Sequence, residues 1–166
     1  NPPPYRFELY RCSGFSFNLS NAVLIHSTSP AAASYSSLVD TTFNDTGINT
    51  KDSAWSYKLI FYSNNDTVGS SAPASSVYLN VQSSDQSLYL SWSENVPWMN
   101  DSFAIYKLNK VTSVYNPIDT VYTHSYTDVG LINDSNYCYY VQTYGHYTLD
   151  SFSKSLINNS QEDCSI

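Results

Sequence analysis

The chain has 166 residues and a formal net charge of −7, with 13% charged and 16% aromatic residues. That length allows one or two domains, and the acidic balance argues against nucleic acid or an anionic membrane as a partner. No apolar run approaches the roughly 18 residues of a membrane-spanning helix, so no membrane insertion is expected.

Alternation of apolar and polar residues with a period of two predicts β-strands along the chain, and no helical apolar stripe is sustained. In the first half, strands are expected at Tyr5–Arg11, Val23–His26, Thr42–Asn44, Trp55–Tyr62 and Thr67–Ser71.

The first of these strands has the pattern of a strand from the middle of a domain. Phe7–Arg11 lines up with Phe103–Lys107 in the second half, and nothing before it supplies two opening strands. A sandwich without those strands would expose a sheet edge and half of its core. We therefore expect residues 1–72 to be a partial domain whose first two strands lie upstream in a longer polypeptide. Donation of these strands by another chain is the alternative.

The stretch Ser70–Ser76 consists of small residues and proline, which is typical of a linker. We place the linker at residues 73–76 and a complete domain at residues 77–166. Strands of that domain are expected at Val77–Val81, Ser87–Ser93, Phe103–Leu108, Asp119–Tyr122, Ser125–Thr127, Asn136–Thr143 and Ser160–Ser165. Glu94–Ser102 and Tyr144–Asn158 are expected to be loops.

A short sequence motif, the repeated phrase, occurs in both halves. Thr42–Ile48 and Ser125–Leu131 share the order hydroxyl, aromatic, any residue, Asp, any residue, Gly, aliphatic, and they start 83 residues apart (42 and 125). A repeat of that length is one small β-domain long. The Asp side chain can cap a turn, and the Gly allows a positive φ angle.

The second copy of the phrase leads into the spacing of a tyrosine corner. Leu131 lies six residues before Tyr137 at the start of a strand, and Trp92 lies on an early strand. These features favour an all-β fold of tandem fibronectin type III-like (immunoglobulin-like) β-sandwiches, the first lacking its opening strands. In the first copy, Trp55 follows Ile48 by seven residues and has no phenol, so a looser corner is expected there.

The second half resembles the tandem fibronectin-type modules of large Bacteroidota surface proteins, which are adhesin-like, associated with gliding motility and exported by the type 9 secretion system. The resemblance covers most of residues 77–164. The matching residues are Leu88–Trp98, Asn100, Ile105–Lys107, Tyr126–Leu131, Tyr137–Val141, Gly145, Tyr147, Leu156–Glu162 and Cys164.

Three cysteines allow one disulfide and one remaining thiol. The resemblance implies that Cys138 and Cys164 are bonded, and strand alternation indicates a bridge between neighbouring strands instead of across the core. The alternative is two free thiols in a cytosolic protein. Cys12 is expected to stay free or to pair outside this segment.

Four aromatic residues in predicted loops are candidates for contact with a ligand: Trp98, Tyr115, Tyr144 and Tyr147. Such side chains can stack on sugar rings, but we favour packing against their own or a neighbouring module. Candidate sites of O-glycosylation follow the short Asp-Ser/Thr pattern of Bacteroidota surface proteins: Thr41, Ser53, Thr67 and Thr120.

No pattern of catalytic or metal-binding residues is present. The three histidines are scattered, no nucleophile elbow or phosphate loop occurs, and the carboxylates lack glycosidase or calcium-loop spacing. No catalytic residue, metal or cofactor is therefore expected.

Together these features predict a non-catalytic structural or adhesive repeat region of a large secreted cell-surface protein. Its expected location is extracellular, after export through the outer membrane. Expected partners are adjacent modules of the same polypeptide, with cell-surface glycans or other surface and secretion proteins as further candidates. The alternatives are a carbohydrate-binding module that accompanies an extracellular enzyme, and a fragment of an enzyme whose catalytic domain lies elsewhere.

Overall fold

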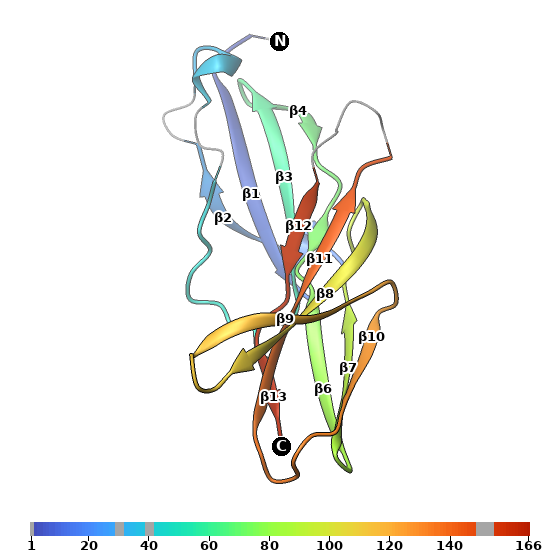
Figure 1. The fold of residues 1–166 in the computed structure, drawn as a ribbon. Coiled ribbons are helices and arrows are strands. Elements are labelled where there is room, and N and C mark those ends of the chain that lie inside the picture. Colours follow the sequence, from blue (N-terminus) through green and yellow to red (C-terminus); the bar gives the residue numbers. More distant parts are fainter. Residues whose placement is uncertain (1, 29–31, 39–41, 149–154) are drawn as a thin grey trace. The chain divides into compact units, whose positions relative to one another are not determined.

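The computed structural model describes residues 2–28, 32–38, 42–148 and 155–166 (Figure 1). These ranges consist mainly of antiparallel β-strands, with two short 3-10 turns at Leu19–Asn21 and Tyr35–Ser37. The predicted all-β class is therefore confirmed. The chain divides into two compact units, Asn1–Ser75 and Ser76–Ile166, which we call unit 1 and unit 2.

Unit 2 is a two-sheet sandwich. One sheet has the order β10-β7-β6; the other has the order β12-β11-β8-β9, with β13 also pairing with β11. This partition of the strands is that of a fibronectin type III-like sandwich. The strands are β6 (Tyr78–Ser84), β7 (Ser87–Ser93), β8 (Met99–Asn109), β9 (Val114–Val121), β10 (Ser125–Val129), β11 (Tyr137–His146), β12 (Leu156–Asn159) and β13 (Asp163–Ser165).

The core of unit 2 lies between these two sheets and follows from the alternation of the strands. Every second residue of β7, β8 and β11 points inward, and the side chains meet in one cluster that is almost wholly removed from water. The buried members of the cluster are Val77, Leu79, Leu88, Leu90, Trp92, Phe103, Ile105, Tyr139 and Val141.

Unit 1 contains a single five-stranded sheet in its described residues. Its order is β2-β1-β3-β4, with β5 also pairing with β3. The strands are β1 (Tyr5–Ser13), β2 (Val23–Ser27), β3 (Trp55–Ser63), β4 (Asp66–Ser70) and β5 (Ala74–Ser75). The order matches the larger sheet of unit 2 strand for strand, with β1 in the place of β8 and β3 in the place of β11.

Several predicted boundaries were wrong. Thr42–Asn44 forms no strand in unit 1. In unit 2, β8 begins at Met99, inside the predicted loop, because Met99 pairs with His146 of a longer β11. β9 begins at Val114 instead of Asp119, because a tight turn capped by the Asn109 side chain starts the strand earlier.

The predicted last strand at Ser160–Ser165 is shorter and forms β13, whereas β12 lies before it and takes up the end of the predicted loop Tyr144–Asn158. Between them, the Gln161 side chain bonds to the backbone of Leu79, accepting from its N–H at 3.1 Å and donating to its carbonyl at 2.6 Å. The Ser160 hydroxyl likewise accepts from the N–H of Val141 at 2.9 Å. Side chains therefore take the place of ladder hydrogen bonds at this point, and the chain passes from one end of β11 to the other.

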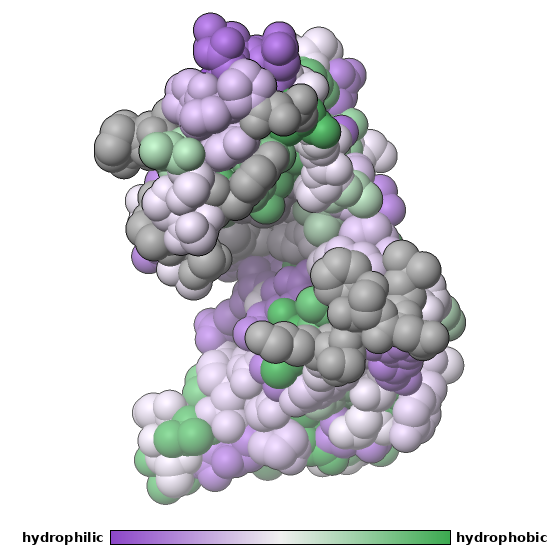
Figure 2. Space-filling view, turned by 90° about the horizontal axis from the view of Figure 1, so that it is seen from above, coloured by the Kyte–Doolittle hydropathy of each residue, from purple (hydrophilic) through white to green (hydrophobic). Residues whose placement is uncertain are grey.

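The expected linker at residues 73–76 contains β5, in which Ala74 and Ser75 pair with Tyr57 and Ser56. These two residues thus extend the sheet of unit 1. The surface is mainly hydrophilic or weakly polar on the side seen in Figure 2, with scattered hydrophobic side chains, in keeping with a chain rich in Ser, Thr and Asn.

Candidate functional site

The repeated phrase places its glycine in the same backbone conformation in both units. Gly47 has φ of 76° and Gly130 has φ of 74°, in the left-handed region that favours glycine. No atom lies within 4 Å of a Cβ built on either residue. The requirement for glycine therefore comes from the backbone turn alone, as predicted from the phrase.

The aspartate of the phrase has a role that the sequence analysis missed. In unit 2, Asp128 lies in β10 and accepts hydrogen bonds from the Lys107 ammonium at 2.7 Å and from the Tyr139 hydroxyl at 2.8 Å. The Lys107 Nζ also lies 4.6 Å from the centre of the Tyr137 ring. The carboxylate thus ties β10 of one sheet to β8 and β11 of the other.

Unit 1 contains the same cluster, with an arginine in the place of the lysine. Asp45 accepts hydrogen bonds from Arg11 at 2.7 Å and from the Tyr57 hydroxyl at 2.9 Å. The Arg11 guanidinium lies 4.8 Å from the centre of the Trp55 ring. A basic residue and a tyrosine at matching positions in both halves were the signal in the sequence that could have revealed this cluster.

Each cluster raises the pKa of its tyrosine hydroxyl. Burial, followed by the hydrogen bond to Asp45, raises the pKa of Tyr57 to about 12. The same two causes raise the pKa of Tyr139 further, because its ring is fully buried. Both hydroxyls therefore remain protonated donors to their carboxylates at neutral pH.

The corner before the long strand is closed in both units, by different atoms. In unit 2 the Tyr137 hydroxyl accepts from the N–H of Ile132 at 3.1 Å, and Leu131 packs against the core. In unit 1 the Trp55 indole N–H donates to the carbonyl of Asn49 at 2.9 Å. The corner of unit 1 is thus held by its own hydrogen bond, a possibility that the expectation of a looser corner overlooked.

A disulfide joins Cys138 and Cys164. The two residues are directly opposite in the register of β11 and β13, and their Cα atoms are 4.1 Å apart. The bridge therefore links neighbouring strands, the arrangement expected from strand alternation. Cys12 is a buried free thiol in unit 1.

Two of the four aromatic candidates lie in strands instead of loops. Tyr115 is the second residue of β9, and Tyr144 lies within β11. Tyr140 stacks on Tyr106 with ring centres 4.6 Å and planes 6° apart, and Tyr115 meets the Tyr140 ring edge-on at 5.0 Å. The hydroxyls of Tyr115 and Tyr144 donate to Glu162 and Gln142, respectively.

The other two candidates, Trp98 and Tyr147, lie just before β8 and just after β11, and their rings meet edge-on at 5.9 Å. The Trp98 indole donates to Asn100 at 3.0 Å, and the Asn100 amide donates to the buried Glu94 carboxylate at 2.7 Å. A Cβ at Gly145 would lie 2.4 Å from the Met99 carbonyl oxygen, which explains the glycine beside this cluster.

Three of the four candidate glycosylation sites lie in described residues. Thr67 and Thr120 are exposed on the edge strands β4 and β9, and Ser53 is half-buried in a loop before β3. Thr41 lies outside the described residues. One close group of three potential metal ligands occurs among the described residues, namely Cys138, Glu162 and Cys164, but both of its sulfurs belong to the disulfide.

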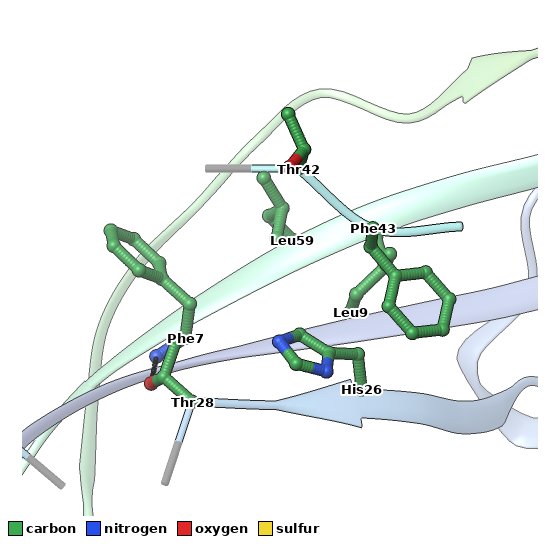
Figure 3. A pocket seen from close by; sticks show the side chains of 7 residues that line it. All are labelled: Phe7, Leu9, His26, Thr28, Thr42, Phe43 and Leu59. Carbon is green, nitrogen blue, oxygen red and sulfur yellow. Dashed lines mark hydrogen bonds between the residues drawn. The ribbon is translucent and has the colours of Figure 1, made fainter. Parts of the chain in front are cut away.

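A hollow of about 420 Å³ lies on one face of the unit 1 sheet (Figure 3). Side chains from β1, β2 and β3 form its floor, and Phe43 lies over it with its ring stacked on that of His26 at 4.9 Å between centres. The lining residues are Phe7, Leu9, His26, Thr28, Thr42, Phe43 and Leu59.

Compared with known proteins, the chain matches no family model and no curated protein. Among solved structures, the chicken interferon gamma receptor alpha chain aligns with a TM-score of 0.35 and 12% sequence identity, over 98% of this chain and 85% of that one. In the described residues, no helix has the length and apolar character needed to cross a membrane.

Proposed function

We propose that this chain is part of a tandem array of fibronectin type III-like modules that serves as a non-catalytic spacer in a secreted surface protein. The observation that carries the proposal is the repeated cluster of aspartate, basic residue and tyrosine. Asp128 and Asp45 make the same two hydrogen bonds within the same strand order. Two copies of one framework in one chain are typical of proteins built from tandem domains.

The contacts of the aromatic residues favour a spacer over a carbohydrate-binding module. A platform for a sugar needs a ring available to the ligand, whereas the candidate Tyr115 meets the Tyr140 ring edge-on and donates its hydroxyl to Glu162. Trp98 and Tyr147 likewise contact each other, and Trp98 is tied to Asn100. These rings support the sheet and the adjacent loop of their own unit.

The disulfide supports a location outside the cytosol, because such bonds persist in oxidising compartments. The resemblance of residues 77–164 to type 9-secreted, gliding-motility-associated proteins extends the proposal to the surface of a Bacteroidota cell. In that setting the partners are the adjacent modules, and adhesion to glycans or other surface proteins is a role for neighbouring domains.

Glycan-array binding by the intact chain tests the spacer function against its alternative. We expect no specific binding. The double variant Trp98→Ala/Tyr147→Ala removes the candidate contact residues, and Tyr122→Ala, which alters a 79% exposed ring elsewhere, is the matched control. A glycan signal that is lost in the double variant and kept in the control would replace the spacer with a carbohydrate-binding module. Turnover of any array glycan would contradict the non-catalytic assignment.

The location is tested by the intact mass of the protein isolated from its native source, before and after reduction. We expect a gain of two hydrogens on reduction, from Cys138 and Cys164. An unchanged mass would remove the support for an oxidising compartment.

A further inference from the structure

The free edge of β6 in unit 2 is not protected by the sequence of the strand itself. β6 forms the border of the smaller sheet, and its seven residues include no charged side chain and no proline. Its register with β7 runs without a shift. Charged residues, prolines and bulges are the usual features that keep an edge strand from pairing with another chain. β6 therefore depends on protection from another part of the unit.

Two other border strands of the chain have such features. β9 contains Pro117 and Asp119, and its pairing with β8 includes a register shift. β4 begins with Asp66, and its pairing with β3 also includes a register shift. The contrast shows that β6 differs from these borders in its own sequence.

Side chains from residues 160–163, which we call the strap, occupy the edge of β6. The Gln161 amide accepts a hydrogen bond from the N–H of Leu79 and donates one to the carbonyl of the same residue. The Asp163 Oδ2 accepts from the N–H of Val81 at 3.0 Å. Gln161 thus exchanges two bonds with one residue, as a paired residue in a neighbouring antiparallel strand does.

The strap is fixed on its other side to β11. The backbone N–H of Ser160 donates to the carbonyl of Val141 at 2.8 Å, and its hydroxyl accepts from the N–H of Val141 at 2.9 Å. Cys164, directly after the strap, is bonded to Cys138. Ser160 also forms a parallel bridge with Val77, just before β6. The strap therefore follows the edge of β6 at residues 77, 79 and 81 while it is held by the opposite sheet.

We propose that the strap keeps the edge of β6 from pairing with β6 of a second copy of this chain. Leu79 and Val81 direct their N–H groups to this edge, since the strap accepts from both. Two copies of β6 related by a twofold axis would pair antiparallel and satisfy these groups in both. The buried Leu79 of each copy would then lie on the same face of the joined sheet, with the exposed Asn80 on the other.

The two side chains of the strap oppose this pairing in different ways. Gln161 already bonds to both backbone groups of Leu79, so an incoming strand would have to displace it. The Asp163 carboxylate only accepts hydrogen bonds and places a negative charge at the edge, and a second copy would bring the same charge. The inference concerns a contact surface of unit 2 and does not depend on the spacer function.

The test is the oligomeric state of the variant Gln161→Ala/Asp163→Ala, measured by analytical ultracentrifugation over a range of concentrations. We expect the unaltered chain to remain a monomer and the variant to form a dimer, with self-association at least about tenfold tighter. Amide hydrogen exchange locates the contact. The amides of Leu79 and Val81 in the variant should exchange more slowly as the concentration rises.

A matched control removes the same two kinds of side chain elsewhere in unit 2. Asp85→Ala/Asn133→Ala also deletes one carboxylate and one amide, and it removes the bond from the Gln86 N–H to Asn133 at 2.9 Å. This control should remain a monomer. Adding Asn80→Lys to the strap variant should restore the monomer, because pairing would bring the two lysines together at an exposed position of β6.

The exchange of the β11 amides shows whether the strap variant is folded. A folded variant that stays a monomer at every concentration would overturn the proposal and leave the strap with a purely structural role. A dimer that persists after Asn80→Lys, or that leaves Leu79 and Val81 unprotected, would also overturn it. If the double variant does not fold, Asp163→Asn takes its place, because it keeps the acceptor and removes the charge. Self-association of Asp163→Asn no tighter than that of the unaltered chain would contradict the proposal.

Discussion

The two units contain the same larger sheet and the same aspartate cluster, yet only unit 2 closes a core around them. Ile105 and its counterpart Leu9 occupy matching positions, and the first is fully buried while the second is half-buried. The phrase Ser125–Leu131 contains a strand, and its copy Thr42–Ile48 has none in its described residues. The comparison teaches that a strand requires its neighbour, because a lone strand leaves its backbone groups unpaired.

The corners before β3 and β11 show that different side chains can hold the same turn. Tyr137 accepts a hydrogen bond from an upstream N–H, whereas Trp55 donates one to an upstream carbonyl. Both bonds fix how the long strand enters its sheet. A large ring with one polar atom at its edge is the feature that the two residues share.

The largest expected effect is in the closed core. Ile105→Ala should lower the stability of unit 2 by about 4 kcal/mol, because it leaves a cavity beneath β7. Leu9→Ala should lower the stability of unit 1 by only about 1 kcal/mol, because Leu9 already contacts solvent. Native-state hydrogen exchange resolves the two units separately. Equal losses would show that the face of unit 1 is covered in solution.

Removal of the disulfide should have the next largest effect and should act on unit 2 alone. Replacing Cys138 and Cys164 with alanine opens a loop of 26 residues and should lower stability by about 3 kcal/mol. Cys12→Ala is the control for unit 1 and should leave the exchange of β11 unchanged. Urea unfolding followed by exchange at β11 measures the difference, and an unaltered midpoint for the double variant would contradict the prediction.

The aspartate cluster offers a matched pair of smaller substitutions. Asp128→Ala leaves the Tyr139 hydroxyl without its acceptor in a closed core and should destabilise unit 2 by about 2 kcal/mol. Asp45→Ala should cost unit 1 about 1 kcal/mol, since water can reach Tyr57 more easily. Asp119→Ala, at an exposed position of β9, is the control and should change stability little. A larger loss for Asp45→Ala than for Asp128→Ala would reverse the comparison.

The smallest effect should be equal in the two units. Gly130→Ala and Gly47→Ala each place a side chain at positive φ without a steric contact, so each should cost about 1 kcal/mol. Gly69→Ala in β4 also meets no atom within 4 Å but has no positive φ, so it should be neutral or slightly stabilising. Thermal unfolding of the three variants checks this, and unequal losses at the two turns would show that their conformations differ.

Much of the architecture followed from local patterns in the chain. Alternation located β1, β7 and β11 to within a few residues, because inward and outward side chains differ in polarity on every strand. The Asp-x-Gly pattern located both turns, because positive φ depends on the residue itself. The six-residue interval from Leu131 to Tyr137 located the corner, since both ends of that bond lie close together in the sequence.

Other features depended on partners far away in the sequence, and no local pattern could reveal them. Asp128 was expected to cap a turn, but its Oδ2 accepts hydrogen bonds from Lys107 and Tyr139 on the opposite sheet. Tyr115 and Tyr144 were predicted to lie in loops. In the structure they lie in β9 and β11, which pairing with β8 and β12 extends beyond the predicted bounds. Strand pairing and side-chain burial depend on contacts between segments that are far apart in the sequence. The phrase shared by the two units therefore forms a strand only in unit 2, where β7 lies beside it.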